Sequence, residues 1–143
     1  MRRELQQIEK LLSEYDDLIE SSRSIAPTLI EYTALGAVLQ SFYNGVENIF
    51  QTIGKRVDGQ IPTGESWHKD LLLQMGREAE SRKPVITQAT IERLQPYLGF
   101  RHVSRHTYTF VLVWDKMQNL VWELRDVWQA VQADVELFLV LSE

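Results

Sequence analysis

The sequence contains no cysteine, so neither disulfide bonds nor thiolate metal ligands are available to it. No apolar run approaches the roughly 20 residues that a membrane-spanning helix needs, and the first residues do not resemble a signal peptide. Low-complexity segments and internal repeats are missing as well. These absences favour a folded, cytoplasmic protein and give little support to a role in a membrane.

The chain also lacks an excess of positive charge, because its 143 residues carry a net charge of −5. Indiscriminate binding to nucleic acid depends on neutralisation of phosphates, so any contact with nucleic acid should be local. A chain of this length favours one domain with one core. We therefore predict a single helical domain over residues 1–143.

Apolar residues recur three and four positions apart along most of the chain, which is typical of helices with one buried face. No stretch alternates polar and apolar residues, so no strand is predicted. Glycines and prolines within residues 54–64 predict the main loop. The predicted helices span residues 2–23, 27–53, 65–80 and 88–98, followed by a last long helix that ends near residue 141. The predicted fold is an all-α, antiparallel, up-and-down bundle of long helices plus two shorter ones.

Acidic residues are missing from one window, residues 93–114, although the chain has 20 of them. This window contains Arg101, His102, Arg105, His106 and Tyr108. Arginine offers a fixed fork of donors that fits phosphate, and histidine exchanges protons near neutral pH. The cluster therefore predicts a site for an anionic, phosphate-containing partner.

We expect this cluster to begin the last long helix, because Gly99 resembles the end of the preceding one. The helical repeat places Arg101, Arg105 and Tyr108 together, facing solvent or a partner. For Arg101 and His106 to touch one phosphate, Arg101 should lie in the turn before the helix. The positive end of the helix dipole would then help to hold the anion.

Two other interpretations apply to the same residues. Two arginines four positions apart are common on a solvated helix face, and a histidine near the end of a bundle more often packs or caps than catalyses. His102 and His106 could share a metal ion, but the nearest downstream acid is Asp115 and no cysteine completes a ligand set. We therefore predict no metal and no cofactor.

Polar residues elsewhere are also open to two interpretations. Asn44, Glu47 and Asn48 interrupt the apolar second helix. They could orient catalytic groups or line a polar face, and the second interpretation is slightly favoured. His68 follows the main loop and is interpreted as the start of the third helix. The tryptophans of the last helix are expected to be core residues or dimer anchors rather than stacking platforms for bases; they are Trp114, Trp122 and Trp128.

The spacing Arg101, four residues, His106, one residue, Tyr108 resembles the Arg-x4-His-x-Tyr motif of the HepT toxins, which belong to the HEPN superfamily of metal-independent ribonucleases. The surrounding segments resemble one HepT-like branch in the same order, over about residues 35–114. These segments are Phe42-Tyr43-Asn44-Gly45-Val46-Glu47-Asn48-Ile49-Phe50, Trp67-His68-Lys69-Asp70-Leu71-Leu72 and Tyr97-Leu98-Gly99-Phe100-Arg101-His102.

This resemblance implies a homodimer in which two copies of the motif face each other across a cleft and cut single-stranded RNA through its 2′-hydroxyl. His106 would be the general base or acid, and Arg101 would hold the scissile phosphate. The nucleophile belongs to the RNA, so no metal is required. Arg93, His102 and Arg105 are further candidates for contacts with RNA phosphates.

The resemblance also implies a partner, a minimal nucleotidyltransferase antitoxin that adenylylates Tyr108. Added nucleotides would block the entry of RNA and repel it. The alternative is a non-catalytic helical subunit that binds a nucleotide or substrate for a nucleotidyltransferase. It is motivated by the acidic net charge and by the lack of a second obvious proton donor within one chain.

Overall fold

The computed structural model describes residues 1–106 and 112–142, with the backbone alone described for residues 103–106. Within these residues the chain is helical and forms no strand beyond one isolated bridge between Ala79 and Arg82. The elements are α1 (Arg2–Ser21), α2 (Leu29–Ile53), η1 (Gly54–Asp58, a π-helical turn), α3 (Trp67–Met75), α4 (Gln88–His106) and α5 (Trp114–Leu141). The all-α prediction is confirmed.

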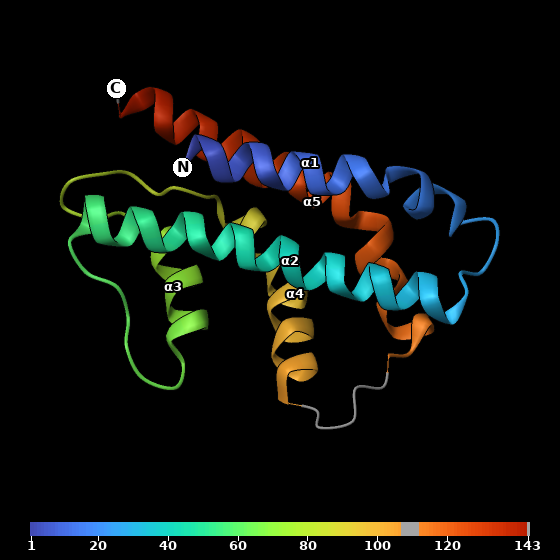
Figure 1. Ribbon diagram of the computed structural model, residues 1–143. Coiled ribbons are helices and arrows are strands. Elements are labelled where there is room, and N and C mark those ends of the chain that lie inside the picture. The colour runs from blue at the N-terminus through green and yellow to red at the C-terminus, as the bar shows by residue number, and fades with distance from the viewer. Residues whose placement is uncertain (107–111, 143) are drawn as a thin grey trace.

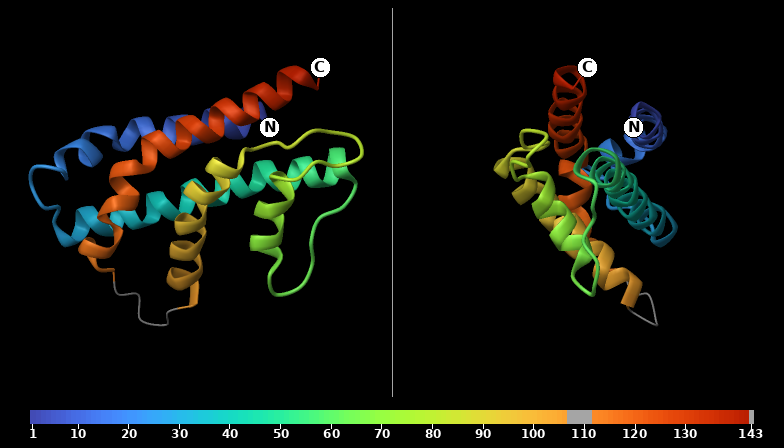
Figure 2. Two further views of the ribbon diagram at one scale, coloured as in Figure 1. Left: turned by 180° about the vertical axis from the view of Figure 1, so that it is seen from behind. Right: turned by 90° about the vertical axis from the view of Figure 1, so that its left-hand side faces the viewer.

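The long helix α2 lies at the centre of the bundle and contacts every other helix (Figure 1). Helices α1 and α5 lie side by side along one flank of α2, and both ends of the chain lie at the same end of the molecule (Figure 2). Helices α3 and α4 project from the opposite flank. No helix among the described residues combines the length and apolarity needed to cross a membrane.

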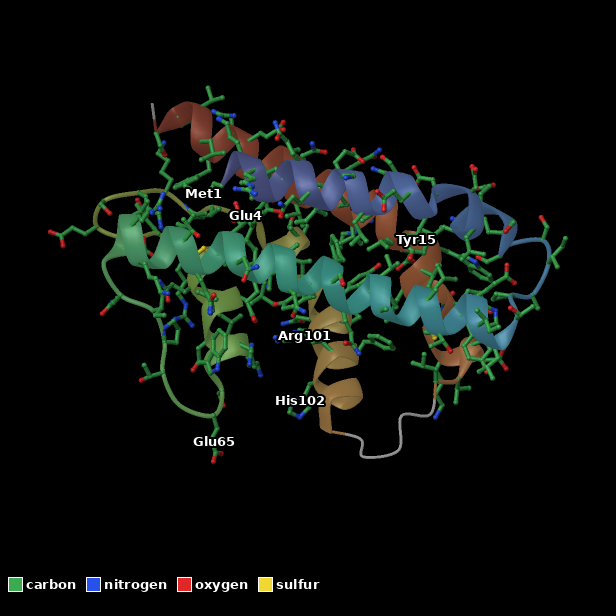
Figure 3. All side chains as sticks on the ribbon, in the orientation of Figure 1. Met1, Glu4, Tyr15, Glu65, Arg101 and His102 are labelled. Carbon is green, nitrogen blue, oxygen red and sulfur yellow. The ribbon has the colours of Figure 1, made fainter. Side chains whose placement is uncertain are left out.

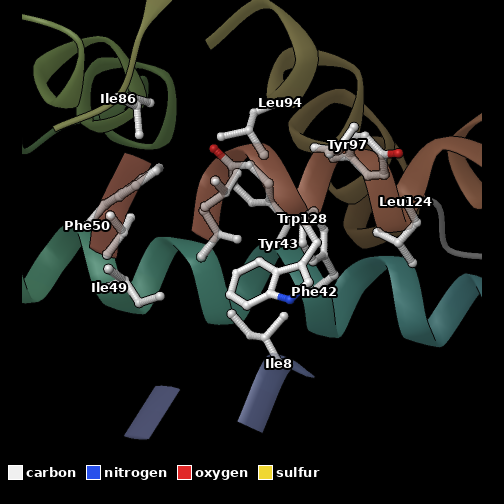
Figure 4. Packing of buried hydrophobic residues seen from close by; sticks show 14 of the residues in the cluster. Ile8, Phe42, Tyr43, Ile49, Phe50, Ile86, Leu94, Tyr97, Leu124 and Trp128 are labelled. Carbon is white, nitrogen blue, oxygen red and sulfur yellow. The ribbon is translucent and has the colours of Figure 1, made fainter. Parts of the chain in front are cut away.

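The core is centred on aromatic side chains of three helices (Figure 4). Phe42 of α2 makes edge-to-face contacts with Tyr97 of α4 and Trp128 of α5, at centroid distances of 5.4 and 6.3 Å. Such pairs contribute about 0.5–1.5 kcal/mol beyond the area that they bury. The Tyr97 hydroxyl donates to the carbonyl of Leu120 at 2.7 Å. Trp128 is therefore a core residue, as the sequence predicted.

Local signals explain where α2 begins and where it ends. Thr28 forms a capping box with Glu31, in which each side chain accepts from the backbone N–H of the other residue. At the other end, η1 continues the helix through Asp58, so the predicted loop starts later than its first glycine suggested. Gly59 then ends the helical path at φ 77°, a left-handed conformation that favours glycine.

Helix α3 is shorter than the predicted helix over residues 65–80, because it ends at Met75. A side chain at Gly76 would collide with Ile91, and the Met75 carbonyl accepts from the backbone N–H groups of Val85 and Ile86. These contacts turn the chain toward the start of α4. Tertiary contacts hold the segment over residues 76–87, and the spacing of apolar residues cannot predict such contacts.

The largest difference from prediction concerns α4, which does not end near Gly99 but runs on to His106 with Pro96 inside it. The charged cluster therefore lies at the carboxyl end of α4, and α5 starts separately at Trp114. A helical glycine costs about 1 kcal/mol relative to alanine. Contacts of Arg101, beyond Gly99, stabilise the continuation. Pro96 is exposed, so the carbonyl that it leaves without an N–H partner can be hydrated.

Candidate functional site

A buried carboxylate on α2 is the starting point of the site. Glu47 lies on the apolar face of α2, four residues after Tyr43, and is 4% exposed. A buried carboxylate is costly unless a cation and hydrogen bonds compensate for the lost water. Helices α3 and α4 each bring a nitrogen-bearing side chain to it.

Arg101 of α4 provides the cation. Its Nη1 lies 3.4 Å from Oε1 of Glu47, and its Nε donates to Oδ1 of Asn44 at 2.5 Å. Of the two predicted surroundings of Arg101, solvent or a partner, solvent is wrong, since Arg101 is 8% exposed and points toward α2 (Figure 3). Although residues 93–114 contain no acid, the fold brings the carboxylate of Glu47 to Arg101 from another helix.

His68 of α3 completes the cluster. Its Nδ1 lies 2.7 Å from Oε2 of Glu47 and 3.0 Å from Nη1 of Arg101. The ring stacks on Trp67, with centroids 3.6 Å apart and planes inclined by 29°. We refer to Asn44, Glu47, His68 and Arg101 as the Arg101 cluster. It joins α2, α3 and α4, three helices that are distant in sequence.

Two residues of the Arg101 cluster, His68 and Arg101, line a pocket of about 900 Å³ between the start of α3 and the second half of α4. The pocket is lined by residues 64–69 and, from α4, by Gln95, Leu98, Gly99, Arg101 and His102. The described lining contains two cations, Lys69 and Arg101, the imidazoles of His68 and His102, and a single acid, Glu65. Such a pocket combines donors for an anion with the flat ring of Trp67.

The other sequence-predicted site residues are distributed as follows. His102 is exposed and lines the pocket, next to Arg101. Arg93 is also exposed on α4, but it lies eight residues before Arg101 and does not line the pocket. The backbones of Arg105 and His106 form the last turn of α4.

The remaining predicted positions have no described side chain. For Arg105 and His106 the structure describes only the backbone, and Tyr108 lies outside the described residues. Among the described residues, no group of three or more metal-ligating side chains gathers. The alternative in which His102 and His106 share a metal ion involves the side chain of His106, which the structure does not describe.

One electrostatic expectation is wrong because of the α4 boundary. The sequence suggested that the cluster sits at a helix start, where backbone donors and the positive dipole end attract anions. It sits at the carboxyl end of α4, where the helix dipole places partial negative charge that repels an anion. Attraction of an anion to this site therefore depends on side chains.

Tyr43, one helical turn before Glu47, is fully buried against the cluster. Burial raises the pKa of its hydroxyl, the carboxylate of Glu47 raises that pKa further, and Arg101 partly opposes both. The hydroxyl therefore stays protonated and neutral at physiological pH. Its position is that of a core residue rather than of a proton-transfer group.

Fold and site together define the class of protein, an all-α bundle of the HEPN type. A model of the family described as HepT-like protein matches residues 34–141, about three quarters of the chain. The chain belongs to this HepT-like family, as its motif and flanking segments indicated. No curated protein and no solved structure matches the chain. Membership of the family suggests a HEPN-type toxin with ribonuclease activity that acts within a toxin–antitoxin pair.

Sequence reasoning noticed three residues of the Arg101 cluster without assigning them to the site. For Asn44 and Glu47 the sequence slightly favours a polar face over a role in orienting catalytic groups, and for His68 it favours the start of a helix. The overlooked signal was the register of Glu47, which is spaced from Tyr43 and Phe50 by four and three residues and so shares their buried face. A carboxylate at such a position requires a cationic partner.

Proposed function

We propose that this protein is a metal-independent endoribonuclease toxin of a HepT-type toxin–antitoxin pair, active in the cytoplasm as a homodimer. The observation that carries the proposal is Arg101, which is fixed by Asn44 and Glu47 in the wall of a cationic pocket. A guanidinium held in one orientation can bind a phosphate without first losing conformational freedom. Family membership and the complete Arg101, His106, Tyr108 motif support the same conclusion.

In the proposed reaction, the 2′-hydroxyl of RNA attacks the adjacent phosphate. Arg101 binds the phosphate and stabilises the negative charge that develops on its oxygens. His106, five residues further along α4, transfers a proton to or from the reacting oxygens, a role typically worth about 10²–10⁴-fold in rate. His102, Arg105 and Arg93 would contact neighbouring phosphates. Because the nucleophile is part of the substrate, the reaction requires no metal and no cofactor.

The proposed control of this activity is covalent. A minimal nucleotidyltransferase, the antitoxin, would transfer adenylyl groups to Tyr108, two residues after His106. Each added phosphate brings negative charge close to the groups that bind RNA. The modified toxin would therefore neither admit nor bind its substrate.

Cleavage of total RNA and tRNA in the presence of EDTA tests the proposal. We expect cutting by the wild type and by Lys10→Ala, which removes an exposed positive charge from α1. We expect no cutting by Arg101→Ala or His106→Ala. Mass spectrometry should first establish that Tyr108 is unmodified. If the folded, unmodified wild type cuts nothing, the non-catalytic binding subunit replaces this proposal.

A further inference from the structure

Cleavage of RNA through the 2′-hydroxyl requires two proton transfers, one from the attacking oxygen and one to the leaving oxygen. Each copy of the motif contains one imidazole for this purpose, His106. We propose that His68 is the second proton-transfer residue, the general base that Glu47 orients toward the 2′-hydroxyl. This inference rests on the proposed ribonuclease function and adds a catalytic residue to it.

The hydrogen bonds of His68 determine which of its nitrogens is available to a substrate. Nδ1 cannot donate to Glu47 and accept from Arg101 at the same time. The contact with Oε2 of Glu47 is the shorter one, 2.7 Å against 3.0 Å, and its acceptor is a carboxylate paired with Arg101. This assigns the proton of neutral His68 to Nδ1 and leaves the lone pair on Nε2. An imidazole in this tautomer accepts a proton at Nε2.

The surroundings of His68 keep the ring in place and leave it accessible. Glu47 holds one edge, Trp67 covers one face, and the side chain is still 26% exposed. Among the described residues, Nε2 makes no hydrogen bond, and His68 lines the pocket in which we place the substrate. A carboxylate, a histidine and an open reaction site in this order form the usual arrangement of an enzymatic general base.

Charged groups face His68 from each element around it. Glu47 approaches from α2 and Arg101 from α4, while His102, also from α4, lines the same pocket. Lys69 and Glu65, next to the start of α3, complete the rim. Arg101 therefore positions a phosphate next to the imidazole that would deprotonate the neighbouring 2′-oxygen.

The proposed step balances as follows. Nε2 of His68 takes the proton of the 2′-hydroxyl as the 2′-oxygen bonds to phosphorus. The bond from phosphorus to the 5′-oxygen breaks, and that oxygen receives a proton from His106. The products are a 2′,3′-cyclic phosphate and a 5′-hydroxyl, and the two histidines then exchange their protons with water.

The first test compares wild type, His68→Ala and Lys10→Ala in cleavage of a short RNA oligonucleotide over a range of pH. We expect His68→Ala to lose about 10²–10⁴-fold in kcat. We also expect it to lose the acidic limb of the profile, where the rate rises as the base loses its proton. Added imidazole should restore part of the rate. If His68→Ala only loosened Arg101, its rate would fall equally at every pH and imidazole would restore nothing, and the inference would be wrong.

A second substrate separates the base from the acid. In RNA with sulfur in place of the 5′-bridging oxygen, the leaving thiolate needs no proton. We expect this substrate to rescue His106→Ala, which lacks the acid, but not His68→Ala. Rescue of both variants, or of His68→Ala alone, would overturn the assignment of His68 as the base.

Two controls keep the outcomes distinct. Glu47→Gln retains the size of the side chain and removes its charge. We expect its kcat to fall by a larger factor than its KM changes. Its circular dichroism spectrum should match that of the wild type. It also serves as the test variant if His68→Ala does not fold. If the wild type cuts and Arg101→Ala does not, while both His68→Ala and Glu47→Gln match the wild type, this inference alone fails. If the wild type cuts nothing, the proposed function fails first.

Discussion

Glu47 and Arg101 form a buried ion pair, in which each charge needs polar partners in place of water. Their side chains are 6% and 9% exposed, so neither is solvated well by water. The two differ in what remains when one is removed. Removing Arg101 leaves the carboxylate with its hydrogen bond to His68, whereas removing Glu47 takes away a carboxylate that lies 3.4 Å from a buried guanidinium.

We expect Glu47→Ala to lower the free energy of unfolding by about 3–5 kcal/mol, because it removes the carboxylate that compensates the charge of a buried guanidinium. Arg101→Ala should cost less than Glu47→Ala, since His68 still donates to the carboxylate. Urea denaturation at pH 7, followed by circular dichroism, measures both values. A loss below about 1 kcal/mol for Glu47→Ala would mean that the pair is solvated and does not hold α4 to α2.

At this scale the sequence predicted the site in part. The short motif and the acid-free window identified Arg101 because they are local features of the sequence. The partners of Arg101 lie 33 to 57 residues away along the chain, so no local spacing reports them. The burial of Glu47 could have been inferred from its register, but which cation it meets depends on how α2, α3 and α4 pack.

At the scale of elements, the segment after α3 is held to η1 by one buried ion pair. Arg82 donates through Nε and Nη2 to the two carboxylate oxygens of Asp58, at 2.6 and 2.7 Å, and both side chains are almost fully buried. Gln74 of α3 donates to the same carboxylate at 2.7 Å. Three separate elements thus meet at Asp58.

This ion pair predicts a pH-dependent stability. Burial raises the pKa of Asp58, but the hydrogen bonds from Arg82 and Gln74 and the charge of Arg82 outweigh burial and lower it overall. A carboxyl group with a lowered pKa in the folded state stabilises the fold above its unfolded pKa of about 3.9, and this contribution is lost as pH falls through the folded value.

We therefore expect Asp58→Asn to reduce the free energy of unfolding at pH 7 by about 3 kcal/mol, the cost of breaking a buried pair. The difference from the wild type should shrink as pH falls below about 4, where the wild type loses the same contribution. Urea denaturation at a series of pH values measures the difference. A gap between the two proteins that stays constant down to pH 2 would contradict this origin.

The elements themselves were largely predictable from sequence, and their ends were less so. The start and end of α1 fall within two residues of the prediction, because the repeat of Leu5, Ile8 and Leu12 is clear and these residues form the buried face of the helix. Gly99 and Pro96 were strong local signals against a continuous α4. Contacts of buried Tyr97 and Arg101 with other helices override them.

At the scale of the whole molecule, the net charge of −5 shapes the proposed encounter with RNA. The positive side chains of the pocket would attract RNA from close range, because the rest of the surface repels it. Two copies of the chain that bring their pockets together would double this local positive charge. Dimer formation thus follows from the proposed function as an electrostatic requirement.

Mixing two inactive variants tests whether the proposed dimer shares its sites. We expect the protein to elute at twice its monomer mass in size-exclusion chromatography with light scattering. Arg101→Ala and His106→Ala, each inactive alone, should regain part of the RNA cleavage when they are unfolded together and refolded as a mixture. In half of the sites of a mixed dimer, an intact Arg101 from one copy would meet an intact His106 from the other. A mixture that elutes as a dimer and stays inactive would show that each copy uses only its own residues.

The stacking of Trp67 on His68 gives the molecule an optical signal. An imidazolium in contact with an indole quenches its emission, and a neutral imidazole does so much less. Because the two ring centroids are 3.6 Å apart, we expect the fluorescence of Trp67 to respond to the charge of His68. Subtracting the spectrum of Trp67→Phe isolates this emission from that of the other three tryptophans. We expect this emission to change, without a label, when an anion binds in the pocket beside the stacked rings.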